Sequence, residues 1–277
     1  MKLGFLYTGQ GSQHAGMGAD LYEAFSAFRA VYDHAEVDFD LKKVTFEDPD
    51  GIINQTRYTQ PCMVAFAAGM TAVLREKGIT PAVAAGLSLG EYSALHAAGV
   101  FDAATAIRLV AFRGKAMEEA AAGRESAMMA VLNLDRSPLQ DACDAASDLG
   151  CVVIANYNCP GQIVITGLAE AVAEASEKLK AAGGRRVIPL NVSGPFHSAM
   201  LATAGKELGK VLEGVTLHEL KIPYVTNVTA EYVEDPAETK ALLEKQISSS
   251  VRWQQSVEKM IQEGVDTFVE IGPGKTY

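Results

Sequence analysis

A short glycine-flanked segment, Gly86-Leu87-Ser88-Leu89-Gly90, restricts the fold more than any other part of the chain. It follows the small apolar run Val83-Ala84-Ala85 and precedes a helical pattern, which indicates a tight turn between a buried strand and a helix. Glycines two residues to either side of Ser88 remove side chains that would collide in so sharp a turn. The pattern is typical of a nucleophile elbow, which presents a serine hydroxyl at the N-terminus of a helix.

The same residues allow a simpler interpretation. Ser88 and Glu91 also fit the S-x-x-E spacing of a capping box, in which the two side chains only start a helix. The motif alone does not decide between a nucleophile and a helix cap, because patterns this short recur by chance. The rest of the chain must supply the other groups that a reactive serine needs.

The composition predicts a globular protein with a sizeable core. The chain has 277 residues, of which 48% are hydrophobic and 21% charged. No apolar stretch approaches the roughly 20 residues of a membrane span, and the first apolar run is too short for a signal peptide, so we expect a cytoplasmic protein. The net charge of -10 argues against nucleic acid as a partner. Because the cysteines form no C-x-x-C pair and lack histidines at ligand spacing, we expect reduced thiols and no metal site at Cys62, Cys143, Cys151 and Cys159.

Strand and helix patterns alternate along most of the chain, which predicts the α/β class with a mainly parallel sheet and an α/β-hydrolase-like body. For this body we expect strands at 2–8, 83–85, 222–226 and 267–271, and helices at 21–34, 61–77, 90–98, 102–122, 200–212, 237–246 and 253–263. Pro61 and Asp102 are expected at the start of their helices, as first helical residue and N-cap respectively.

The order of elements changes to β-α-β-β-α-β between residues 127 and 190, which matches the ferredoxin-like unit. We expect strands at 128–132, 151–157, 162–166 and 186–190 and helices at 138–147 and 169–182. The chain is thus predicted to form a large subdomain from 1–126 and 191–277, with a small inserted subdomain at 127–190 and a cleft between them.

A catalytic serine requires a general base, most often a histidine, and the chain has five. His197, in the loop 194–198, is the best candidate because the chain there crosses back from the insert toward the cleft. His14 in the first loop stays possible. The other three lie in helical or alternating polar segments and are poor candidates: His34, His96 and His218.

Arg113 interrupts the apolar face of the helix expected at 102–122. A buried guanidinium is costly without a partner and cannot lose its proton. Either a buried carboxylate such as Glu91 or Glu270 pairs with it, or a ligand that carries its own carboxylate does.

The first loop, at residues 9–13, resembles a dinucleotide fingerprint but fails it, because His14 stands where a glycine is needed. We interpret it as a flexible turn that aims a backbone N–H into the cleft. Together with the N–H of Leu89, this group would form an oxyanion hole for a tetrahedral acyl intermediate.

The chain resembles the malonyl-CoA:acyl carrier protein transacylases, the acyltransferases of fatty-acid and polyketide synthesis. The resemblance covers nearly the whole chain through motifs in the family's order: GQGSQ (9–13), TQP (59–61), GLSLGEYSA (86–94), RGKAM (113–117), NYNCPGQ (156–162), GPFHS (194–198), QISSSVRW (246–253) and EIGPGK (270–275).

The resemblance implies that Ser88 is the nucleophile, His197 the base and Arg113 the group that binds the malonyl carboxylate, with the backbone amides of Gln10 and Leu89 as oxyanion donors. It implies ping-pong transfer of a malonyl group from malonyl-CoA to the phosphopantetheine thiol of acyl carrier protein, with no metal or cofactor and no membrane partner. Nothing in the sequence requires more than a monomer.

Further roles follow from the same resemblance. The backbone carbonyl of Gln246 would orient His197, and Phe196 would limit the bulk of the acyl group. Arg185 and Arg186, at the rim of the insert, would contact CoA phosphates or the carrier protein.

The chain departs from the family pattern at two places. Leu87 stands where many members have histidine, and members usually continue with a further helical segment beyond the position of Tyr277. We expect catalysis to survive the first change, since the expected base is His197. Two other functions fit the same motifs less well: an acyl-thioester hydrolase with the same serine and histidine, and a carrier-binding scaffold without catalysis.

Overall fold

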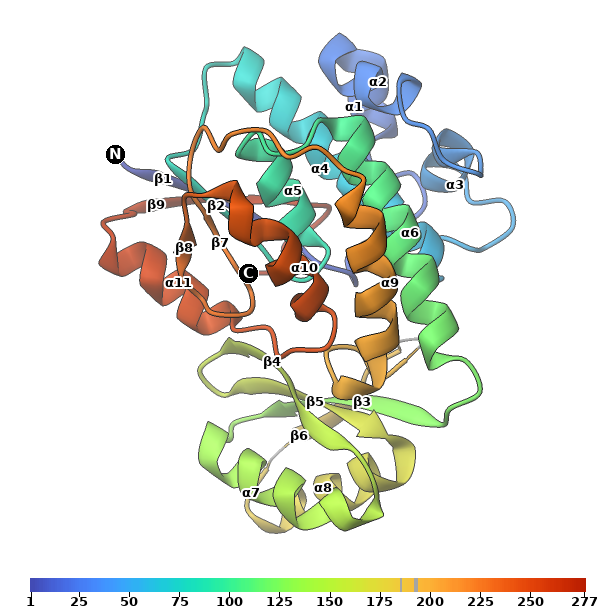
Figure 1. Cartoon of the computed structure of the whole chain (residues 1–277), viewed down its shortest axis with the longest axis vertical. Helices are drawn as coiled ribbons and strands as arrows, with labels where there is room; N and C mark the ends of the chain where they lie inside the picture. The colour runs from blue at the N-terminus through green and yellow to red at the C-terminus, as the bar shows by residue number, and fades with distance from the viewer. Residues whose placement is uncertain (185, 192–193) are drawn as a thin grey trace.

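A computed structural model describes residues 1–184, 186–191 and 194–277 (Figure 1). Its larger sheet has the strand order β8-β7-β2-β1-β9, and all neighbouring strands are parallel except β7 and β8. The strands are β1 (Leu3–Tyr7), β2 (Val83–Gly86), β7 (Tyr224–Val225), β8 (Tyr232–Val233) and β9 (Thr267–Ile271). The predicted α/β class with a mainly parallel sheet is confirmed.

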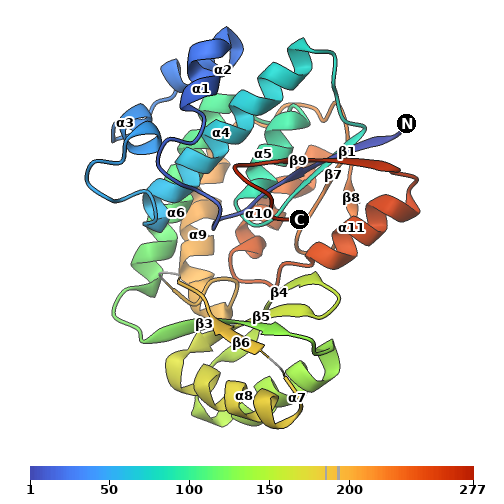
Figure 2. The ribbon, with the colours of Figure 1, turned by 180° about the vertical axis from the view of Figure 1, so that it is seen from behind.

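Helices cover both faces of this sheet (Figure 2). On one face, α4 (Thr56–Glu76) and α5 (Gly90–Ala97) pack small alanine side chains against β1 and β2. On the other face, α11 (Trp253–Gln262) packs Trp253 and Met260 against Leu6, Val83 and Ala85. Strands β1 and β2 are therefore buried on both sides, which explains why they are continuous apolar runs in the sequence.

The remaining helices of the larger body are α1 (Ala19–Ala24), α2 (Ser26–Asp33), α3 (Leu41–Phe46), α6 (Ala103–Ala121), α9 (Ala202–Glu213) and α10 (Thr239–Gln246). The N-cap predicted for α6 is confirmed, because the side chain of Asp102 accepts a hydrogen bond from Thr105 N–H at 2.7 Å. Short 3₁₀ turns lie at Ser147–Leu149, Ala199–Leu201 and Pro236–Glu238.

A second sheet is antiparallel, with the order β4-β5-β3-β6. It contains β3 (Ser126–Leu132), β4 (Val152–Cys159), β5 (Gln162–Leu168) and β6 (Arg186–Pro189), and its two helices are α7 (Arg136–Ala146) and α8 (Ala169–Ala181). The helices bury one face of the sheet, with Leu139 and Leu179 packed against Val131 and Ile165. The predicted β-α-β-β-α-β order is thus observed.

Two local expectations were wrong, and two elements were not expected. The helix expected at 21–34 is two helices, because Phe25 adopts an extended conformation between α1 and α2. Pro61 does not begin α4 but lies inside it, and the first turn is held by Glu118, which accepts hydrogen bonds from the backbone and side chain of Arg57 at 2.9 and 2.6 Å. The sequence analysis expected neither helix α3 nor strand β8, which pairs with β7.

Hydrogen bonds join β4 of the second sheet to the segment that precedes α11 in the larger body. Val251 N–H donates to Ala155 at 2.7 Å, and Tyr157 N–H donates to Val251 at 2.9 Å. These bonds hold β4 next to the segment that precedes α11, and so they position one side of the space between the two sheets. No helix in the described part of the chain is both long enough and apolar enough to cross a membrane.

Candidate active site

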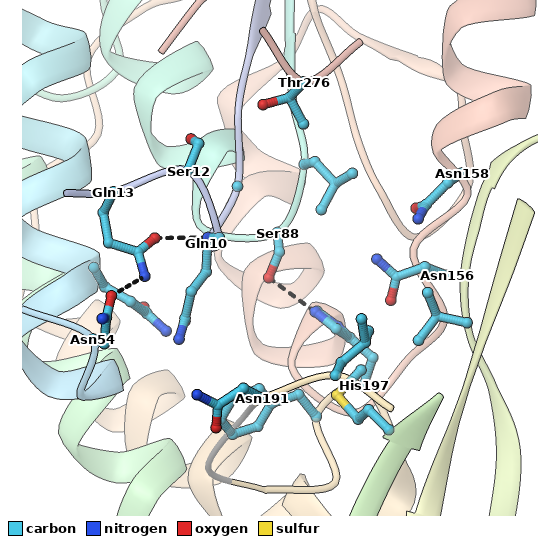
Figure 3. Close-up of a pocket in the computed structure, with 18 of the residues that line it drawn as sticks. Gln10, Ser12, Gln13, Asn54, Ser88, Asn156, Asn158, Asn191, His197 and Thr276 are labelled. Atoms are coloured by element: carbon cyan, nitrogen blue, oxygen red, sulfur yellow. Dashed lines mark hydrogen bonds between the residues drawn. The ribbon is translucent and has the colours of Figure 1, made fainter. Parts of the chain in front are cut away.

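The carboxyl ends of the parallel strands meet at one edge of the larger sheet, where α/β proteins commonly bind ligands. The loop after β1 and the turn after β2 lie at this edge and face the second sheet across a cavity of about 700 Å³ (Figure 3). Loops of the larger body and strands of the second sheet line the cavity, including Gln10, Ser88, Met128, Asn156, Val164, Phe196 and His197.

Ser88 lies on the turn between β2 and α5. Its φ of 55° is in the left-handed region, which residues other than glycine rarely adopt. The turn is so tight that a Cβ at Gly86 would lie 1.9 Å from the carbonyl oxygen of Gly90. Only glycine fits there. The turn has the geometry of a nucleophile elbow, with the serine hydroxyl at the N-terminus of α5.

The capping-box interpretation of Ser88 and Glu91 was wrong. Helix α5 has no side-chain cap, since Ser88 N–H donates to Asn227 Oδ1 at 2.7 Å and Glu91 Oε1 accepts from Asn227 N–H at 2.6 Å. Glu91 thus points below the turn, into the core, rather than back along the helix to Ser88. Its burial raises the pKa of its carboxyl group to about 8.

His197 Nε2 lies 2.9 Å from Ser88 Oγ (Figure 3). Its other ring nitrogen, Nδ1, lies 3.1 Å from the backbone carbonyl oxygen of Gln246. Because a carbonyl can only accept, Nδ1 carries the proton and Nε2 is free to accept the serine proton. Burial and the nearby charge of Arg113 lower the pKa of His197 to about 4, so the imidazole is neutral at physiological pH.

Arg113 projects from α6 to the base of the site and is fully buried. Its guanidinium donates to Gln60 Oε1 at 2.8 Å, to Gln246 Oε1 at 3.0 Å and to Ser88 Oγ at 3.1 Å. All three acceptors are neutral groups.

Neither carboxylate considered from the sequence forms an ion pair with Arg113. Glu91 acts on it only through longer-range electrostatics, and Glu270 accepts instead from the backbone N–H groups of Thr276 and Tyr277. Within the described ranges, the Arg113 guanidinium has no carboxylate at ion-pair distance. A ligand carboxylate would supply the charge that the protein does not.

Two residues of this site were missed by sequence reasoning. Gln60 contacts Arg113, and the side chain of Asn227 contacts the elbow. Gln60 lies in the TQP motif, and a buried glutamine on an apolar helix could have indicated a polar partner. Asn227 follows a two-residue strand and has no comparable local signal.

The model of the acyl transferase domain family matches residues 4–277. The chain belongs to this acyl transferase family. The malonyl CoA-acyl carrier protein transacylase of Bacillus subtilis (strain 168) is 42% identical over 99% of this chain and 87% of its own length. That of Escherichia coli (strain K12) is 38% identical over 99% of this chain and 90% of its own length.

Solved structures agree with this assignment. The MCAT of Streptococcus pneumoniae superimposes with a TM-score of 0.95 at 43% identity, covering 99% of this chain and 90% of that one. A malonyl-transacylase solved in complex with its type II PKS acyl-carrier protein gives a TM-score of 0.95 at 39% identity, with the same shares covered. The resemblance inferred from the sequence motifs is thereby confirmed.

The two backbone amides expected to form the oxyanion hole in this acyl transferase are those of Gln10 and Leu89. In the described ranges, neither N–H donates to a protein acceptor. Gln10 and Ser88 both line the cavity (Figure 3). Leu89 directly follows the serine, at the N-cap of α5. An N–H group without a protein acceptor can donate to the oxygen of a ligand.

Phe196, which is 6% exposed, lines the cavity next to His197, and Leu87 also contributes to the wall. Arg186 is exposed on β6 opposite Leu132 and does not line the cavity. Arg185 lies outside the described residues. No cluster of three His, Cys, Asp or Glu side chains suited to a metal ion occurs among the residues that the structure describes.

Proposed function

We propose that this acyl transferase moves a malonyl group from malonyl-CoA to the phosphopantetheine thiol of an acyl carrier protein, through a malonyl ester on Ser88. The relatives named above are malonyl transacylases, and one of them was solved with an acyl-carrier protein. The observation that supports this function best is the buried Arg113, which lies 3.1 Å from Ser88 Oγ without a carboxylate partner.

In the first half-reaction, His197 Nε2 accepts the proton of Ser88 Oγ as the oxygen attacks the thioester carbonyl carbon. The negative charge that develops on the carbonyl oxygen is stabilised by the N–H groups of Gln10 and Leu89. The C–S bond then breaks, and the CoA sulfur takes the proton from His197. The carbonyl of Gln246 keeps the imidazole in the required orientation and stabilises its protonated form.

In the second half-reaction, the thiol of the carrier's phosphopantetheine arm gives its proton to His197 and its sulfur attacks the malonyl ester. The C–O bond to Ser88 breaks, and the serine oxygen recovers the proton from His197. All of these groups belong to one chain, so we infer that a monomer suffices. We also propose that Arg186, with Arg185, contacts the carrier or the CoA phosphates beyond the cavity.

Turnover with both substrates tests this function. We expect catalytic amounts of the protein to convert malonyl-CoA and holo acyl carrier protein into malonyl-carrier, detected by mass spectrometry of the carrier. Accumulation of free malonate with unmodified carrier would instead indicate a hydrolase. Unchanged substrates would contradict both activities.

Arg113→Ala is expected to reduce the preference for malonyl-CoA over acetyl-CoA while acyl transfer persists. Removing one partner of a buried charge pair costs about 2 to 5 kcal/mol, which corresponds to a loss of selectivity of roughly 30-fold or more. The measurement is the ratio of kcat/KM for the two donors.

Arg108→Ala is the matched control, because Arg108 lies on the same helix but is exposed. We expect this variant to keep the wild-type donor ratio. A wild-type ratio in Arg113→Ala would exclude Arg113 as the group that binds the malonyl carboxylate.

A further inference from the structure

The side-chain amide of Asn227 bridges the two sides of the nucleophile turn. Its Nδ2 donates to the carbonyl of Gly86 at 2.7 Å, and its Oδ1 accepts from Ser88 N–H at 2.7 Å. Asn227 is 1% exposed and does not line the cavity. It therefore contacts the backbone on either side of Leu87 without contacting the space where a substrate would lie.

These contacts continue the sheet beyond the last backbone pairing. Strand β7 pairs in parallel with β2 through Ala84 with Tyr224 and Ala85 with Val225. Beyond that point the main chain of β2 turns sharply toward α5 and no further backbone ladder forms between these strands. The amide of Asn227 then supplies the donor and the acceptor that a neighbouring strand would otherwise provide.

The turn needs such support because Ser88 has a φ of 55°. A left-handed conformation is unfavourable for a residue with a side chain, and it persists only where surrounding contacts hold it. Gln246 contributes a second contact, since its Nε2 donates to the carbonyl of Ser88 at 3.0 Å. Asn227 and Gln246 together hold both backbone polar groups of the serine.

Asn227 is itself held by the core. Its backbone N–H donates to Glu91 Oε1 at 2.6 Å, and its carbonyl accepts from Arg252 N–H at 3.1 Å. Glu91 belongs to the first turn of α5 and is fully buried. Hydrogen bonds thus link the nucleophile turn to Asn227 and Asn227 to α5. Apart from Ser88 itself, none of the residues in these bonds lines the cavity.

We propose that Asn227 is a positioning residue that holds Ser88 Oγ within reach of His197, and that Glu91 acts through Asn227 by fixing its backbone. The proposal rests on the proposed role of Ser88 as nucleophile. It assigns to these buried groups an effect on the rate of Ser88 acylation rather than on donor binding, because neither touches the cavity.

Asn227→Ala is the first test. Loss of the bridge lets the turn relax, and a displacement of about 1 Å can cost on the order of 100-fold in rate. We expect the single-turnover acylation rate constant with malonyl-CoA to fall about 100-fold. The Kd for malonyl-CoA, measured in a Ser88→Ala background, should stay within about threefold because the lining residues are unchanged.

Thr239→Val is the matched control for stability. Thr239 is buried, and its Oγ1 lies 2.9 Å from the hydroxyl oxygen of Tyr224 on β7. It does not contact the nucleophile turn. We expect this variant to lower Tm while leaving acylation unchanged. Wild-type acylation by a folded Asn227→Ala variant would overturn the proposal.

Two substitutions of Glu91 test its hydrogen bond with the backbone of Asn227. They also test the positioning role if Asn227→Ala does not fold. Glutamine keeps an oxygen acceptor for Asn227 N–H, and it resembles the neutral carboxyl group that burial favours, whereas leucine removes the acceptor at similar volume. We expect Glu91→Leu to lower the acylation rate constant at least about tenfold and Glu91→Gln to restore it to near the wild-type value. Equal rates in the two variants would contradict the role of Glu91.

A label that needs no acyl donor separates this proposal from the proposed function. Phenylmethylsulfonyl fluoride reacts with an activated serine: a bond forms between Ser88 Oγ and sulfur, fluoride leaves, and His197 takes the proton. We expect the labelling rate to fall in Asn227→Ala and Glu91→Leu as acylation does. If malonyl-CoA fails to acylate the wild-type protein but the labelling rates still differ between variants, only the assigned acyl donor is wrong. Equal labelling rates in the wild type and all variants would refute the positioning role.

Discussion

Replacement of Ser88 by alanine is expected to lower malonyl transfer by about 10⁴-fold or more, since the variant has no oxygen to accept the acyl group. The Kd for malonyl-CoA should change little, because Arg113 and the amides of Gln10 and Leu89 are retained. The measurement pairs a steady-state assay of malonyl-carrier formation with calorimetric titration of malonyl-CoA. A large loss of turnover with unchanged binding would place the effect in the chemical step.

Ser93→Ala provides the control for this substitution. Ser93 is a buried serine of α5 that does not line the cavity, so its loss changes the same helix without touching the site. We expect near wild-type turnover from this variant. Turnover by Ser88→Ala at a comparable level would show that another group accepts the malonyl moiety.

His197→Ala is expected to lower the acylation rate about 10³-fold, and the wild-type rate should depend on pH through this residue. His197 must be unprotonated to accept the serine proton. Because burial and Arg113 lower its pKa to about 4 from the usual 6.5, the rate should stay constant as pH falls through 6.5 and reach half its maximum near pH 4. The measurement is the rate of sulfonyl fluoride labelling against pH, since this label has no titrating group.

The other ionisable groups at the site are not expected to produce a fall in rate near pH 4. Arg113 stays charged throughout, and the carboxyl group of Glu91, with a pKa raised to about 8, titrates on the alkaline side. His14→Ala is the control, because His14 lies in the exposed first loop and should leave rate and profile unchanged. A midpoint near 6.5 would mean that the base titrates like a solvent-exposed histidine.

Much of the site could be predicted because each of its main residues stands out in the local sequence pattern. Ser88 stands between glycines after an apolar strand, and Arg113 interrupts an apolar helical face. His197 lies where the chain returns from the ferredoxin-like unit. The sequence alone could not show that these side chains meet, but the alternation of strands and helices brings them to one edge of the sheet.

The supporting contacts could not be predicted in the same way. Asn227 and Gln60 act through side-chain amides, and a lone amide in a loop or helix has no pattern that reveals its partner. The spacing of Glu91 from Ser88 left a helix cap open as an alternative, whereas in the tertiary fold Glu91 accepts from the backbone of Asn227 instead. The break at Phe25 and the position of Pro61 likewise depend on packing rather than on local preference.

The covalent intermediate provides the most direct test of the central claim that Ser88 carries a malonyl group between two thiols. Intact-mass analysis after mixing with malonyl-CoA should show one malonyl adduct, located on the peptide that contains Ser88. Holo acyl carrier protein should then remove the adduct and become malonylated, while buffer alone should leave it in place over the same time. No adduct, or an adduct lost equally fast in buffer, would contradict the account.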